Sequence, residues 1–193
     1  MPVDLMEKFN THMDGSLAIF LDRRIPFLVY KELGDRVGQR HIETKQETVT
    51  NLQFYFHDTI SSENPSAIKV AQAAGTEKSP THFGALLMAD DPLTKTSDPN
   101  SKLLGRAQGV YGSAGKDELA LVMAISFCFT DGMYNGSSIS ILGKNSAMSP
   151  VREMQVVCGT GLFWLARGYA LAKTHWFNEL GDAIVDHNVT VVH

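Results

Sequence analysis

The chain has 193 residues, of which 44% are hydrophobic and 20% are charged, and its formal net charge at pH 7 is -4. Length and composition are those of a globular protein with one sizeable core, while the acidic balance argues against a nucleic-acid partner. No apolar run reaches the ~18 residues that a membrane-spanning helix needs, so no membrane partner is expected. Two cysteines, Cys128 and Cys158, exclude a disulfide framework; they are expected to be buried free thiols, or a pair if their strands are neighbours.

The first 48 residues differ from the rest of the chain. Their charges are clustered and they show no alternation of apolar and polar residues, which predicts a loosely ordered N-terminal arm outside the main fold. A short apolar run at 16–21 is interrupted by Asp22, Arg23 and Arg24. A secretory signal peptide needs an unbroken apolar core of roughly 7–15 residues, so this segment lacks the pattern of one.

Residues 49–193 are predicted to form a second unit that is built from strands. Apolar and polar side chains alternate with the period of two that places neighbours on opposite faces of a sheet, and turn-forming residues separate the segments at short spacing. This pattern predicts an all-β barrel or sandwich, and glycines inside the strands favour a barrel because its corners must bend. The strands are expected at 48–60, 67–74, 83–90, 103–113, 119–130, 137–142, 151–158, 162–174 and 182–192.

The segment 151–174 has the pattern of a β-hairpin that turns at Gly159-Thr160-Gly161, where glycine tolerates a positive φ. Antiparallel pairing would bring Arg152 close to Thr174. The return strand has bulky side chains of one parity and small ones of the other. A bare face inside a closed barrel leaves room for a ligand, whereas in a sandwich it packs against another sheet, and the pattern leaves both open. The small residues are Ala166, Gly168, Ala170 and Ala172.

No standard catalytic motif and no metal-ligand spacing occurs, so the candidate site consists of polar residues on faces expected to point inward. Asp58 follows two phenylalanines of the same parity. Desolvation by these rings would raise its pKa and suit it to proton donation; the alternative is that Asp58 caps the next turn. Arg152 shares a face with Met154, and a buried guanidinium needs either a carboxylate in a structural ion pair or an anionic ligand.

Three further features complete the set of candidates. Tyr111 ends a run of small residues, so it either aims its hydroxyl into a cavity or packs in the core. Asp90 and Asp91 form an acid–base pair, or one of them fixes the turn before a proline. Asn135 and Asn188 stand in N-glycosylation sequons, which weakly support secretion.

Several of these segments, taken together and in order over residues 50–193, resemble the plant dirigent proteins. The resemblance implies an eight-stranded antiparallel β-barrel of the allene-oxide-cyclase-like type, usually assembled as a homotrimer, with a pocket for a phenolic small molecule in each barrel. It also implies that no cofactor and no metal is used and that the protein is secreted to the apoplast. The matching segments include Phe54-Tyr55-Phe56-His57-Asp58, Asp90-Asp91-Pro92-Leu93-Thr94, Gly105-Arg106-Ala107-Gln108-Gly109, Val151-Arg152-Glu153-Met154 and Ala166-Arg167-Gly168-Tyr169-Ala170.

The resemblance also implies the chemistry. Some members steer the coupling of phenoxy radicals that a separate oxidase supplies, and others, the pterocarpan synthases, dehydrate an isoflavanol to a quinone methide that closes on its own phenol. The lignan-forming members carry an aspartate where this chain has Asn145, and they have two cysteines that this chain lacks. The sequences of residues 134–137 and 151–154 are more similar to the pterocarpan synthase subgroup than to the lignan-forming members.

We therefore expect a dirigent protein that binds a phenolic quinone methide and guides its cyclisation; as an enzyme it would be a cofactor-free dehydrating cyclase, a carbon–oxygen lyase. The alternatives are a non-catalytic guide of radical coupling and a cell-wall scaffold. The resemblance places Asp58, Tyr111, Arg152 and Thr174 in the pocket, and we expect catalytic roles for the first three. Substrate contacts are expected for Thr174, Asn145, Phe56 and Asp90.

Overall fold

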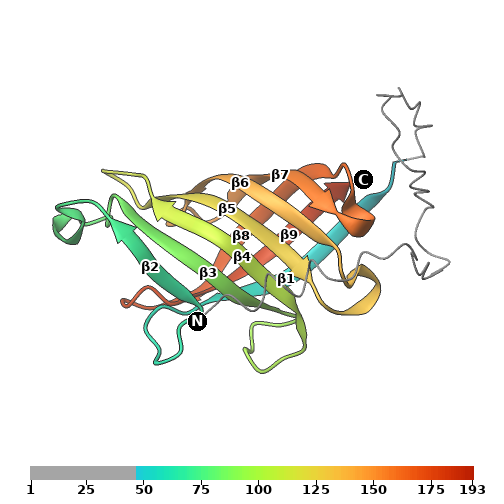
Figure 1. The fold of residues 1–193 in the computed structure, drawn as a ribbon, viewed down its shortest axis with the longest axis horizontal. Helices are drawn as coiled ribbons and strands as arrows, with labels where there is room; N and C mark the ends of the chain where they lie inside the picture. The colour runs from blue at the N-terminus through green and yellow to red at the C-terminus, as the bar shows by residue number, and fades with distance from the viewer. Residues whose placement is uncertain (1–46) are drawn as a thin grey trace, which may run out of the picture. The chain divides into compact units, whose positions relative to one another are not determined.

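The computed structural model describes residues 47–193, so the predicted N-terminal arm lies outside the described residues except for its last two positions. Nine strands form one antiparallel sheet in the order β1-β9-β8-β7-β6-β5-β4-β3-β2, and β1 also pairs with β3 (Figure 1). This pairing closes eight strands into a barrel, which confirms the predicted fold, and β2 is added outside on β3. The strands are β1 (Val49–Asp58), β2 (Ala67–Gln72), β3 (Ala85–Thr94), β4 (Leu103–Ser113), β5 (Ala120–Phe129), β6 (Ser138–Ser146), β7 (Arg152–Thr160), β8 (Arg167–Phe177) and β9 (Ala183–Val192).

Short 3-10 turns interrupt three of the connections: η1 (Thr76–Lys78), η2 (Gly132–Tyr134) and η3 (Gly161–Phe163). Within residues 47–193 no helix has the length and hydrophobicity required to cross a membrane. The two cysteines are free, as expected, but Cys158 is exposed and Cys128 is only partly buried, so the expectation that both thiols are buried is wrong.

Strand β3 closes the barrel because it is longer than the sequence pattern predicts. Its first half pairs with β2, and its second half pairs with β1 at Tyr55–Thr94 and Phe56–Leu93. The sequence pattern predicts the end of this strand at residue 90, before Pro92, whereas β3 continues to Thr94. Proline has no N–H to donate and fits where a ladder ends, and the β1–β3 ladder does end beside it, at Leu93.

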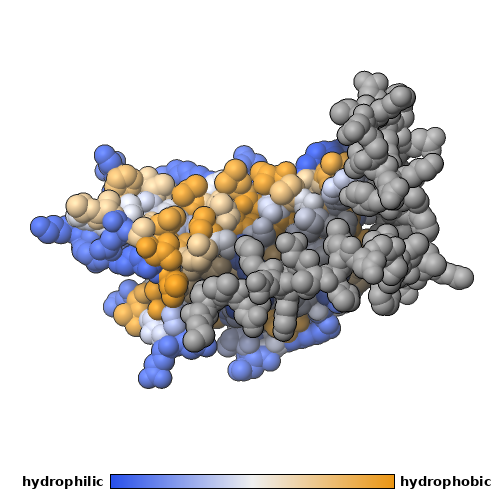
Figure 2. All heavy atoms as spheres, viewed as in Figure 1, coloured by the Kyte–Doolittle hydropathy of each residue, from blue (hydrophilic) through white to orange (hydrophobic). Residues whose placement is uncertain are grey.

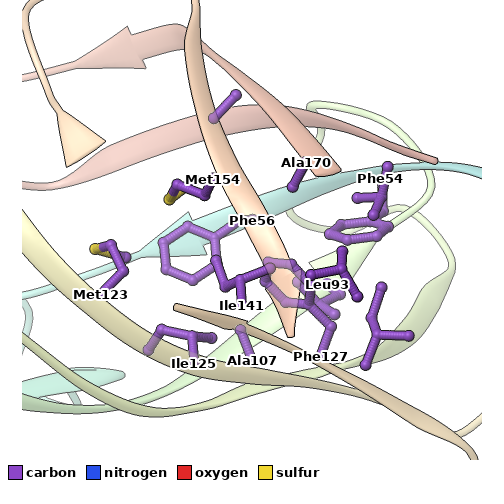
Figure 3. Packing of buried hydrophobic residues seen from close by; sticks show 14 of the residues in the cluster. Phe54, Phe56, Leu93, Ala107, Met123, Ile125, Phe127, Ile141, Met154 and Ala170 are labelled. Carbon is purple, nitrogen blue, oxygen red and sulfur yellow. The ribbon is translucent and has the colours of Figure 1, made fainter. Parts of the chain in front are cut away.

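The inward faces of the strands fill the barrel with hydrophobic side chains (Figure 3). Phe54 of β1 and Phe127 of β5 meet edge to face with ring centroids 4.9 Å apart, a favoured aromatic geometry. Ile125, Ile141 and Met154 are almost completely buried around them. The core therefore occupies the bore of the barrel rather than a layer between two sheets.

The small residues of β8 were expected to leave open space in the bore of the barrel, but most of that space is filled. Ala170 and Ala172 do point inward and are buried, but the room beside them is taken by large side chains from other walls (Figure 3). The cavity that remains between these side chains has a volume of about 30 Å³. Small residues on one wall thus let phenylalanine and methionine side chains from the other walls reach close packing.

One end of the barrel is closed by aromatic rings. Phe163, which is fully buried, stacks on Tyr134 with centroids 5.1 Å apart and meets His193 edge to face at 5.0 Å. Residues 161–166 form η3 and a turn in which Leu165 has φ 62°, so β8 begins at Arg167 and not at the predicted position 162. Gly159 permits this arrangement, because a Cβ there would lie 2.3 Å from the carbonyl oxygen of Phe163.

A continuous row of apolar side chains crosses the outside of the sheet from β2 to β6. The row follows the register, since each member is the cross-strand partner of the next. Met88 is 46% exposed and Leu142 is 49% exposed, and hydrophobic residues gather on this face of the molecule (Figure 2). We call this the outer apolar row; its members are Ile68, Met88, Val110, Ala124 and Leu142.

Candidate active site

Polar side chains of the inward faces gather at the end of the barrel opposite the aromatic closure. The barrel strands are antiparallel, so the last residues of β1, β4, β6 and β8 meet the first residues of β5, β7 and β9 at this end. We call it the mouth. It carries one group of polar residues around Asp58 and a second around Arg152.

The first group joins a carboxyl group to a phenol. Tyr111 of β4 donates its hydroxyl to Oδ2 of Asp58 on β1 at 2.7 Å. Burial raises the pKa of Asp58 to about 6, while the hydrogen bond from Tyr111 acts in the opposite direction. Burial, together with the Asp58 charge, also raises the pKa of the Tyr111 hydroxyl, so this group remains a hydrogen-bond donor at neutral pH.

The alternative role of Asp58, a cap of the next turn, is wrong. That turn is held instead by Asp182, whose Oδ1 accepts hydrogen bonds from the backbone N–H groups of Ile60 at 2.8 Å and Ser61 at 2.9 Å. These bonds, with the hydroxyl of Ser61, hold the pKa of Asp182 at about 2. Asp58 is therefore free of a structural task in the turn, and its Oδ1 atom is buried without a hydrogen-bond partner among the described residues.

The second group surrounds a buried guanidinium. Arg152 is 5% exposed, and it donates from Nε to Oδ1 of Asn145 at 3.0 Å and from Nη1 to Oγ1 of Thr174 at 2.9 Å. Within residues 47–193 it forms no salt bridge, so the structural ion pair is not present there. Burial lowers its pKa, but arginine stays charged at neutral pH. A buried guanidinium held only by neutral groups is suited to bind an anionic or phenolic oxygen.

A small cavity lies inside the mouth. Phe56 lines it and is 5% exposed, as predicted for a residue that faces the interior, and Asn145 lines it beside Arg152. His187 also lines it, stacked on Phe54 with ring centroids 5.6 Å apart. Burial lowers the pKa of His187 to about 4, so the imidazole is neutral at physiological pH and adds polarity without charge.

Exposed apolar side chains surround the mouth. They come from the β6–β7 turn, the start of β7, the end of β8 and the β8–β9 turn, which all belong to this end of the barrel. An aromatic and aliphatic rim of this kind favours the approach of a flat apolar molecule. The rim consists of Met148, Val151, Trp176, Phe177 and Leu180.

The structure does not bring Asp90 together with the other predicted site residues. Its side chain lies on the outside of the barrel, where Nε of Arg106 donates to it at 2.5 Å and Nε2 of Gln108 at 3.1 Å. The interior carboxyl group is that of Asp91, which is 0% exposed. The parity of β3 explains the correction, since Asp91 shares its face with Ala89 and Leu93.

Sequence reasoning placed Asp91 only in a possible pair with Asp90, and it did not single out His187. A signal was available for both. Extending the β3 pattern through Pro92 puts Asp91 on the inward face, and β9 alternates so that His187 shares the parity of Val185 and Val189. Among residues 47–193 no cluster of three or more histidine, cysteine or acidic side chains has the geometry of a metal site.

The two glycosylation sequons differ in their surroundings. Asn135 is exposed in the connection between η2 and β6. Asn188 is exposed on the outer face of β9, in a strand that is paired with β1 on one side and β8 on the other. Both side chains therefore point away from the site.

A comparison with protein families gives a match to the family described as "Dirigent-like protein" over residues 49–192, which spans the whole barrel. The chain belongs to the dirigent family. It is 64% identical over 152 residues to Dirigent protein 23 of Arabidopsis thaliana, with 78% of this chain and 81% of that protein covered.

Other dirigent relatives are named for an activity. Pterocarpan synthase 1 of Glycyrrhiza echinata is 41% identical over 187 residues, which cover 94% of this chain and 100% of that protein. A solved structure of a pterocarpan synthase dirigent protein is 43% identical, covers 79% of this chain and 88% of that chain, and superimposes with a TM-score of 0.71. This plant dirigent protein thus has pterocarpan synthases among its relatives, and its barrel is the fold of that family.

Proposed function

We propose that this dirigent protein binds a phenolic quinone methide at the mouth of its barrel and guides the cyclisation of that intermediate. The observation that carries the proposal is the pair of polar groups at one end of an apolar barrel. One is an acid with a raised pKa, and the other is a buried guanidinium without a carboxylate partner among the described residues. The relatives that are named pterocarpan synthases support a reaction of this class.

Each residue of the proposed site has a defined task. Asp58 gives a proton to the hydroxyl group that leaves the substrate, with Tyr111 holding the carboxyl group in position. Arg152 binds a phenol oxygen and stabilises the negative charge that forms as this phenol loses its proton, so that the phenolate can push electrons through the ring toward the leaving group; Thr174 orients that oxygen by a hydrogen bond. The apolar walls exclude water, which would otherwise trap the methide. The reaction is a cofactor-free loss of water, a carbon–oxygen lyase reaction.

A substrate of two or three rings needs more room than the present cavity offers. Met123 and Met154 line this cavity, and methionine has three rotatable bonds, so it repacks at lower cost than Phe56 and Phe127, which also line it. We propose that these two side chains move when the ligand enters.

The direct test supplies a panel of isoflavanols and monolignols to the purified protein, each with and without a phenol oxidase, and analyses the products on a chiral column. The proposal predicts a faster loss of water from isoflavanols, with one product enantiomer in excess and no requirement for oxidase. Product formation at the uncatalysed rate and in racemic form from every isoflavanol would contradict it.

The second candidate function is non-catalytic guidance of radical coupling. Dirigent protein 23, which is 64% identical, carries the family name and is not named for a lyase reaction. In the same panel, this function predicts an enantiomeric excess only in the samples with oxidase, and an unchanged total rate. The cell-wall scaffold predicts no rise in Tm with any phenol.

We propose that the protein is a homotrimer and that the outer apolar row contributes to its subunit contacts. A closed assembly would cover this row, which otherwise exposes apolar side chains across five strands. Met88→Lys is expected to shift the protein from trimer toward monomer, since a charge would have to be buried at the contact. Light scattering coupled to size-exclusion chromatography measures the mass. Glu153→Lys, at an exposed position on β7, is the control that should remain trimeric; a monomeric parent protein would contradict the proposal.

We also propose secretion to the apoplast. The exposed position of Asn135 supports it, because a glycan on this turn would extend into solvent. Protein isolated from plant tissue should lose mass on treatment with a glycosidase, and Asn135→Gln should remove that change. A cytosolic location of the tagged full-length chain would contradict the proposal.

A further inference from the structure

Asp91 is the one described residue whose two carboxyl oxygens are both buried without a hydrogen-bond partner. The hydroxyl of Ser66 lowers the pKa of Asp91, but it donates to the carbonyl oxygen of His57 and accepts from the N–H of Thr59. The side chain is 0% exposed. An ionised carboxylate in such surroundings is costly, so the carboxyl group keeps its proton more strongly than an exposed one.

Asp91 and Asp58 lie close to the point where strands β1 and β3 separate. The two strands pair antiparallel at Tyr55–Thr94 and Phe56–Leu93, and each aspartate lies two residues beyond the last pair. Side chains two residues apart on a strand share a face, so Asp58 points inward with Phe56 and Asp91 with Leu93, close enough for the charge of Asp58 to act on Asp91. Three buried side-chain oxygen or nitrogen atoms lack a partner within residues 47–193, and all three belong to these two carboxyl groups.

Two neighbouring carboxyl groups in an apolar interior do not both ionise at neutral pH, because like charges repel there. Tyr111 donates its hydroxyl to Asp58, which stabilises the negative charge on that residue and leaves the proton on Asp91. Burial, and then the Asp58 charge, raises the pKa of Asp91 to about 8. The other charged groups that act on the pair are Asp182, which raises the pKa of Asp58, and Arg106 and Asp90 on the outer face, which act on Asp91 in opposite directions.

We propose that Asp91 is a positioning residue that stores the proton which Asp58 delivers to the substrate. The proposal rests on the proposed lyase function. In that reaction the proton stored on Asp91 first passes to the ionised Asp58. The carbon–oxygen bond of the alcohol then breaks, and the leaving hydroxyl takes this proton from Asp58 and departs as water. The proton that the substrate phenol releases returns to the pair. The protein therefore has the same number of protons before and after each turnover.

The test is a titration of the two carboxyl groups by carbon-13 NMR of selectively labelled aspartate, which needs no substrate. The wild type is expected to show two coupled steps, one near pH 6 and one near pH 8. Asp91→Asn should remove the upper step. Asp58→Asn should lower the pKa of Asp91, because the neighbouring charge is gone. Asp90→Asn, the matched control on the outer face, should leave two steps.

An Asp91 that titrates like an exposed aspartate, or whose pKa is unchanged by Asp58→Asn, would overturn the proposal whatever the substrate is. Thermal unfolding gives a second readout. A carboxyl group with a raised folded-state pKa stabilises the fold at low pH, and this stabilisation is lost progressively between the unfolded-state pKa and the folded-state pKa. The Tm of the wild type should therefore fall as the pH rises from about 4 to about 8 and level off above, and the Tm of Asp91→Asn should fall less.

Activity then separates this inference from the proposed function. With an isoflavanol that turns over, Asp91→Asn should change the pH dependence of kcat, whereas a merely structural role would change its size at all pH values alike. Two coupled titrations without turnover of any isoflavanol would support the carboxyl pair and contradict the lyase function. Turnover with a pH profile that is unchanged in Asp91→Asn would overturn the proton-store role alone.

Discussion

Asp58→Asn is expected to lower kcat for the dehydration of an isoflavanol by about 10²–10⁴-fold, the usual contribution of a general acid. The amide keeps the size of the side chain and accepts the hydrogen bond from Tyr111, but it has no acidic proton to give. The measurement is the rate of product formation under saturating substrate. Undiminished turnover would remove Asp58 from the acid role.

The pH dependence of kcat also tests the role of Asp58 as the acid. Asp58 acts in its protonated form and receives its proton from Asp91, so the kcat of the wild type should fall as the pH rises through about 8, and that of Asp91→Asn should already fall through about 6. Asp186→Asn is a suitable control, because Asp186 lies on β9 with its side chain near Gln53 on the outer face. Its pH profile should match that of the wild type.

Arg152→Lys is expected to lower kcat/KM by about 10²–10³-fold, the size of effect seen when a donor to a developing oxyanion is lost. A lysine keeps the charge but cannot donate to Asn145 and Thr174 while also binding a ligand oxygen, because it lacks the planar fork of the guanidinium. Steady-state kinetics measure the loss. The matched control is Arg167→Lys, whose guanidinium is exposed and pairs with Glu47 on the surface.

Tm measurements show whether the loss comes from chemistry or from folding. A free cation in place of Arg152 is partly buried, so a modest fall in Tm is expected without a phenolic ligand. If Arg152 binds the phenol, an added phenol should raise the Tm of the wild type and should raise that of Arg152→Lys much less. Equal rises in both proteins would contradict the role of Arg152 in ligand binding.

Alternating side chains and turn residues were sufficient to predict an all-β chain, and most strands lie within a few residues of their predicted bounds. The predicted end of β3 at Asp90 is wrong. A proline normally ends a strand, and pattern alone does not reveal that β3 continues past Pro92 to close the barrel against β1. That closure depends on pairing between residues far apart in the chain.

The inward-facing residues of the site could be predicted from the sequence, but most of the contacts between them could not. Asp58, Tyr111 and Arg152 lie on inward faces that the period of two identifies, and the proximity of Arg152 to Thr174 follows from the hairpin and is confirmed at 2.9 Å. The partner of Asp58, Tyr111, comes from β4, so this hydrogen bond could be identified only in the three-dimensional structure. The filled bore could not be predicted from the small residues of β8 alone, because the large side chains that face them come from other strands.

The aromatic rings of Phe163, Tyr134 and His193 leave the mouth as the entrance that the described part of the barrel offers to its site. Substrate and product would then use the same passage, so one must depart before the other arrives. A dirigent lyase built this way should show strictly competitive inhibition by its own product, and its turnover should slow as that product accumulates.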